Sequence, residues 1–175
     1  RRVIRLHPMV IMGSIIGALF FFFQKSPCFP NMDNISVGTV LIIMLYGCTL
    51  LPLPLKWDIR GWTEMHPLNG PAWSLYYEYI GNILYALFVR KFNKVALSIL
   101  VFLAACATLH LCLTAPNGDI VGGWALNWEQ QYVGFVRLLY PFFAGLLLSR
   151  LGWLIRVKKR AFWWCSLMIV IVLSV

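Results

Sequence analysis

One carboxylate lies inside an apolar run that otherwise carries no charge. Glu78 is six residues into the run 72–89, where an ionisable group in lipid is costly and usually functional. In a helix, residues three or four positions apart lie on one face. The polar residues with this spacing are Ser74, Glu78, Asn82 and Tyr85. Hydrogen bonding between helices is the structural alternative, but it does not require an ionisable group. We therefore predict that Glu78 is functional.

A second charge, Arg137, lies five residues into the run 132–149. At about 1.5 Å per residue, Arg137 is roughly 8 Å along its helix and Glu78 about 9 Å along its own. We predict that the runs 72–89 and 132–149 point the same way, because one crossing run separates them in either topology. The charges then share a depth, and pairing would lower the cost of burying both. Alternatively, the Arg137 side chain extends to the nearer membrane interface. The sequence leaves both interpretations open.

Arg2 and Arg5 lie three positions apart at the start of the first apolar run. Guanidinium groups bind phosphates well, yet basic residues also flank membrane helices without binding any ligand. The imidazoles of His7, His66 and His110 are candidate general bases by residue type, but none has a partner at a suggestive spacing. We find no nucleophile elbow and no metal-binding spacing of Cys and His, so we predict no metal site.

Composition indicates which elements hold these residues. Of the 175 residues, 61% are hydrophobic and 12% are charged, against about 45–50% and about 25% in soluble domains. Such a chain has too little polar surface for water, whereas helices in lipid need none. The net charge of +9 falls in short clusters between apolar runs, as in cytoplasmic loops. We therefore predict an all-α, polytopic transmembrane helix bundle whose partner is the lipid bilayer, and no nucleic acid.

Six apolar runs approach the length of about 20 residues that a membrane helix needs. They are 8–23, 36–53, 72–89, 95–115, 132–149 and a run that opens near 161. If every run crosses, the basic clusters divide between the two sides of the membrane. If 36–71 returns to the side that it left, nearly all of them lie inside, and the acidic connection 114–131 lies outside. We therefore predict a re-entrant or broken segment over 36–71, where irregular backbone would line a site.

Three motifs in order resemble those of the acyltransferase-3 family of integral membrane O-acyltransferases. Residues 1–8, RRVIRLHP, resemble an "RRxxRxxP" helix entry, and residues 69–78, NGPAWSLYYE, resemble "pxWSLxxE". Residues 134–145, with Arg137 and PFFAG, are similar to a later "R…pFxxG" helix. Together the three motifs are spread over residues 1–145 of the 175-residue chain.

The resemblance implies transfer of an acyl group, often acetyl, from acyl-CoA to a carbohydrate hydroxyl. It implies a multi-pass protein of the bacterial inner membrane, with acyl-CoA as donor substrate and no bound cofactor. Arg2 and Arg5 match positions thought to meet the CoA phosphates. In this interpretation the catalytic residues are Glu78 and Arg137, and the substrate-binding residues are Arg2, Arg5, Trp73, Ser74 and Asn82.

The family's first helix, with its Arg and His, would precede Arg1. We therefore expect residues 1–175 to be a single transmembrane domain, an internal fragment of a longer membrane enzyme that is inactive alone, with the catalytic base upstream of Arg1. The alternative function is a transporter or flippase fragment for a glycan or lipid-linked substrate. A broken helix and a charge pair at mid-membrane suit that function too.

Overall fold

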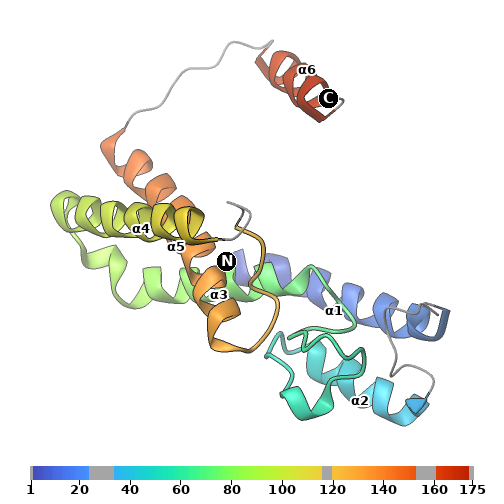
Figure 1. Cartoon of the computed structure of the whole chain (residues 1–175). Helices are drawn as coiled ribbons and strands as arrows, with labels where there is room; N and C mark the ends of the chain where they lie inside the picture. The colour runs from blue at the N-terminus through green and yellow to red at the C-terminus, as the bar shows by residue number, and fades with distance from the viewer. Residues whose placement is uncertain (1, 24–33, 116–119, 153–160, 174–175) are drawn as a thin grey trace.

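A computed structural model describes residues 2–23, 34–115, 120–152 and 161–173 of the chain (Figure 1). Its main elements are α1 (Arg2–Phe20), α2 (Val37–Gly47), α3 (Ala72–Leu87), α4 (Lys94–Thr114), α5 (Trp128–Leu151) and α6 (Ala161–Leu173). Among the described residues, three segments are long and apolar enough to cross a membrane: Arg5–Phe23, Lys94–Thr114 and Trp128–Leu151. The predicted all-α bundle is confirmed for the described residues.

Local capping sets where two of the long helices begin and end. The Asn93 side chain accepts a hydrogen bond from the backbone N–H of Ala96, at 2.7 Å, and so begins α4. The Asn127 side chain caps α5 in the same way. The helix begins at Trp128, four residues before the predicted start at residue 132, because the capping turn is polar and precedes the apolar pattern. Gly152, in a left-handed conformation with φ 73°, ends α5.

The segment after α1 does not cross as a single helix. Two short 3₁₀ helices, η1 (Phe21–Phe23) and η3 (Leu55–Trp57), flank α2, which has only 11 residues. At about 1.5 Å per residue α2 is about 16 Å long, roughly half of a bilayer core of about 30 Å. After residue 47 the chain continues without a long helix to residue 71. This agrees with the broken segment that we predicted over 36–71.

Irregular backbone of this connection packs closely against α1. A Cβ atom added to Gly17 would lie 1.6 Å from the carbonyl oxygen of Leu68, and one added to Gly13 would lie 2.4 Å from the Asn69 amide nitrogen. Only glycine allows this approach, in the way that small residues let membrane helices come close to a neighbour. Residues 65–68 of the connection are therefore buried against protein, as irregular backbone beside a membrane helix requires, whereas residues 61–63 are exposed.

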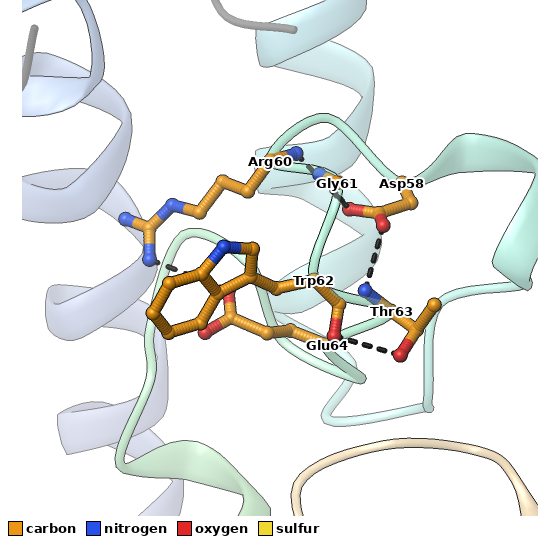
Figure 2. Close-up of polar contacts among 6 residues, drawn as sticks. All are labelled: Asp58, Arg60, Gly61, Trp62, Thr63 and Glu64. Carbon is orange, nitrogen blue, oxygen red and sulfur yellow. Dashed lines mark hydrogen bonds and ion pairs between the residues drawn. The ribbon is translucent and has the colours of Figure 1, made fainter. Parts of the chain in front are cut away.

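The tip of the connection is held by one carboxylate, which Figure 2 shows. Asp58 Oδ1 accepts hydrogen bonds from the backbone N–H groups of Arg60 and Gly61, each at 3.0 Å. Asp58 Oδ2 accepts from the N–H of Thr63 at 2.7 Å. The Arg60 guanidinium also pairs with the Glu64 carboxylate at 3.4 Å. These contacts fix the turn without regular secondary structure.

Contacts between helices give their directions. His7 and Val10 of α1 meet Tyr79 and Ala72 of α3 respectively, so α1 and α3 are antiparallel. Gly134 of α5 faces Tyr77, and Gly81 of α3 faces Leu138 and Phe142, so α3 and α5 are parallel. The predicted common direction of the runs 72–89 and 132–149 is confirmed.

One end of the bundle collects basic residues. The Arg150 guanidinium, near the end of α5, donates hydrogen bonds to the carbonyl groups of Val89, Arg90 and Phe92 between α3 and α4. The turn η4 (Val89–Lys91) and the start of α4 therefore lie beside the end of α5. We call this end, with Arg90, Lys91, Lys94 and Arg150, the basic end. The N-terminus of α1 points toward it, since α1 runs against α3; Arg1 and residues 153–160 lie outside the described residues.

Candidate functional site

Helix α3 is the centre of the candidate site, because it presents three different faces. One face meets α1 through Ala72 and Tyr79, and a second meets α5 through Tyr77 and Gly81. The third face carries the predicted polar residues. Ser74 and Tyr85 are exposed on it, whereas Glu78 and Asn82 are partly buried. The predicted polar stripe is therefore a separate helix face, and we call it the polar face of α3.

Two of the polar side chains are bound to the backbone of their own helix. The Asn82 amide donates to the Glu78 carbonyl oxygen at 2.7 Å, and the Ser74 hydroxyl donates to the Pro71 carbonyl oxygen at 2.9 Å. Within the described ranges, the Glu78 carboxylate makes no hydrogen bond and no ion pair. The carboxylate and the Asn82 side-chain oxygen therefore remain as acceptors on this face.

Arg137 and Trp73, both selected from the sequence, are in contact. The Arg137 guanidinium carbon lies 4.7 Å from the centroid of the Trp73 ring, which is a cation–π arrangement. An Arg137 N–H also donates to the Gly122 carbonyl oxygen at 2.8 Å. Gly122 and Gly123 have φ values of 142° and 105°, which residues with a side chain rarely adopt. The backbone that accepts the hydrogen bond from Arg137 therefore needs glycine at these positions.

The pair between Glu78 and Arg137, which their similar depth would allow, does not form. The helix rotates by about 100° per residue, so Glu78 points away from the α5-facing side chains of Trp73 and Tyr77. Arg137 reaches Trp73 on that α5-facing side instead. The two residues lie at a similar level but on different sides of α3. Their roles in the site are therefore separate.

A groove of about 580 Å³ runs between α3 and α5 near the basic end. Its lining residues are Asn82, Tyr85, Pro141, Phe142, Gly145, Leu146 and Ser149. We call it the α3–α5 groove. Sequence analysis selected its α3 side and missed Ser149. The spacing of Pro141, Gly145 and Ser149, four positions apart in α5, is the signal that could have found the other wall.

The start of α1 lies beside α3. The Nδ1 atom of His7 lies 3.2 Å from the Tyr79 hydroxyl, one residue after Glu78. Arg5 is exposed two residues earlier in α1, about 3 Å closer to the basic end. Arg2 belongs to the same helix, but its side chain lies outside the described part. Sequence analysis missed the contact between His7 and Tyr79, because the two residues are 72 positions apart.

The other two histidines lie elsewhere. His66, in the connection before α3, is buried, and its Nε2 atom lies 3.2 Å from the Leu50 carbonyl oxygen. Burial lowers the pKa of His66, an effect that the hydrogen bond to Leu50 partly opposes. His110 is exposed on α4. Within the described ranges, no group of three or more His, Cys, Asp and Glu side chains could hold a metal ion.

Comparison with known families decides what kind of protein this is. Residues 1–175 match the acyltransferase domain of the acyltransferase-3 type. The chain belongs to the acyltransferase-3 family. It is therefore a membrane acyltransferase, in agreement with the three helices of its described part that are long and apolar enough to cross a membrane. No curated protein and no solved structure matches it.

In this acyltransferase the three motifs lie on helices that touch one another. Residues 2–8 of the first motif begin α1, residues 69–78 lead into α3, and residues 134–145 lie in α5. Helix α3 contacts both α1 and α5. The motif residues therefore gather around one helix rather than along the chain.

Proposed function

We propose that this acyltransferase transfers an acyl group, acetyl in the first instance, from acyl-CoA to a carbohydrate hydroxyl. The site would be the polar face of α3 together with its two neighbours, and the protein would be a multi-pass protein of the bacterial inner membrane. The observation that carries the proposal is the Glu78 carboxylate. Glu78 is partly buried, and along α3 it lies between Trp73, which contacts Arg137, and Asn82, which lines the α3–α5 groove.

The polar face of α3 leads from Trp73 toward the basic end, and this difference in charge supports binding of the two substrates at opposite ends of the face. CoA carries anionic phosphates, and arginine binds phosphates in bidentate geometry. Arg2 and Arg5 lie near the N-terminus of α1, which points toward the basic end, where Arg90 and Lys91 lie. The donor would therefore enter from the basic end. The acceptor would approach from the opposite end, near Trp73.

The reaction forms one bond and breaks another. The acceptor hydroxyl oxygen bonds to the thioester carbon, the carbon–sulfur bond breaks, and the hydroxyl proton passes through a base to the CoA thiolate. This needs a base, stabilisation of the developing oxyanion and alignment of both substrates. Glu78 would orient the base or hold the acceptor hydroxyl. Arg137 uses one N–H for Gly122 and has others for negative charge.

The remaining selected residues fit binding of the acceptor. The Trp73 ring, held beneath Arg137, offers an aromatic surface to a sugar ring. The Ser74 O–H and one of the two Asn82 N–H groups are bound to backbone carbonyls, which leaves the Ser74 and Asn82 side-chain oxygens to accept hydrogen bonds from sugar hydroxyls. Family membership favours this transferase over the transporter alternative.

The test is acyl transfer in membranes that contain the intact protein. Acetyl-CoA with a labelled acetyl group should release CoA and place label on endogenous carbohydrate. The label should be removed by mild alkali, which cleaves esters and leaves N-acetyl groups intact. Label that resists alkali, or CoA release equal to that of membranes without the protein, would contradict the proposal.

A further inference from the structure

We propose that the α3–α5 groove binds the acyl-pantetheine arm of the donor and that Gly145 sets the length of the acyl chain that is accepted. This inference rests on the proposed function. The volume of the α3–α5 groove, about 580 Å³, lies in the range of about 300–1,000 Å³ that is typical of small-molecule sites.

The chemistry of the lining fits this arm. Pro141, Phe142 and Leu146 supply apolar surface for an acyl chain. Asn82 and Tyr85 supply polar groups, which can bind the two amides of pantetheine. A groove for a lipid chain alone would have little use for amide and hydroxyl groups, because hydrocarbon makes no hydrogen bonds.

The position of the groove gives the ligand a direction. Ser149 lines it and directly precedes Arg150, which holds the turn that carries Arg90 and Lys91. Phosphates at the basic end and an apolar chain in the groove match the two parts of an acyl-CoA. The thioester would then lie toward Asn82 and Glu78.

Gly145 has no packing role that accounts for its lack of a side chain. A Cβ atom added to Gly145 would meet no atom within 4 Å, although the residue lines the groove. At Gly134, by contrast, a Cβ atom would lie 2.1 Å from the Tyr77 ring. Glycine inside a helix is less stable than alanine at the same position. Packing thus explains the glycine at 134, and space for a ligand explains the one at 145.

The experiment compares acyl chains of different length on Gly145→Leu in the intact protein. We measure kcat/KM for acetyl-CoA, butyryl-CoA and octanoyl-CoA, with Leu148→Trp, which adds bulk on α5 outside the groove lining, as control. The ratio of kcat/KM for acetyl-CoA to kcat/KM for the longest acyl-CoA that is accepted should rise at least about tenfold in Gly145→Leu. The same ratio should stay unchanged in the control. Transfer by the wild type with an unchanged ratio in Gly145→Leu would overturn this inference alone. A wild type that uses no acyl-CoA would overturn the proposed function.

A second variant covers failure of Gly145→Leu to fold. Gly145→Cys in a cysteine-free background should react with a maleimide in liposomes. Octanoyl-CoA should slow the reaction, while desulfo-CoA, which has no thiol to consume the maleimide, should do so less. Labelling that ignores octanoyl-CoA but speeds up when lipid is replaced by short-chain detergent would assign the groove to a bilayer lipid and overturn the inference.

Discussion

Replacing Glu78 with Gln removes one negative charge from the polar face of α3 and hardly changes the volume of the side chain. Within the described residues, the carboxylate has no hydrogen-bond or ion-pair partner to lose. The Asn82 amide binds the backbone carbonyl of Glu78, which the substitution leaves in place. We therefore expect Glu78→Gln to change the free energy of unfolding by no more than about 0.5 kcal/mol.

The effect on activity should be much larger. Proton transfer by a positioned side chain contributes about 10²–10⁴ to a rate. A carboxylate that orients the base or the acceptor hydroxyl accounts for part of this factor. Glu78→Gln should therefore lower acyl transfer at least about tenfold, which is roughly 1.4 kcal/mol on the barrier. If Glu78 only joined helices by hydrogen bonds, Gln could do the same and activity would survive.

The assay needs a control for folding and one for the chemical change itself. Protein abundance in the membrane and thermal stability in detergent should match the wild type. Glu129→Gln makes the same change at an exposed position in the first turn of α5, and it should leave transfer within about twofold of wild type. Wild-type turnover by Glu78→Gln at normal abundance would refute the assignment, and with it the argument that the polar face is the site.

Three further predictions test the topology, the donor site and the connection. Single cysteines at Lys91 and Val121, both exposed, should be labelled from opposite sides of the membrane, with Lys91 inside. Labelling of Lys91 from outside would contradict the return of 36–71 to the side that it left. Changing Arg2 and Arg5 to Gln should raise the KM for acyl-CoA at least about fivefold and leave expression unchanged, because two charge-assisted contacts to phosphate are lost; an unchanged KM would leave them as topology signals. Because burial lowers the pKa of His66 below its ordinary 6.5, the unfolded chain takes up the proton first. Thermal stability should therefore fall as pH drops below about 6.5, and His66→Gln should weaken this pH dependence. If thermal stability depends on pH equally in both proteins, groups other than His66 cause the dependence.

Much of the fold follows from local patterns in the sequence. The lengths of the apolar runs predict the helices, and the prolines within 36–71, together with the positions of the charges, predict a segment that does not cross in one piece. The spacing of Ser74, Glu78 and Asn82 predicts one polar helix face. These features depend on residues within a few turns of one another, and the period of the helix relates them directly. The common direction of α3 and α5 likewise follows from counting crossings.

The arrangement of the site depends on contacts between residues far apart in the chain. The helical period shows which residues share a face, but it does not show how that helix is rotated against its neighbours. The close approach of Gly134 to Tyr77 sets this rotation for α3 and α5, and it turns Arg137 toward Trp73 rather than Glu78. The same packing leaves the groove beside Gly145 open. The sequence by itself therefore determines the helices and the candidate residues, and tertiary packing decides which of them meet, because the rotation of a helix is set by its neighbours.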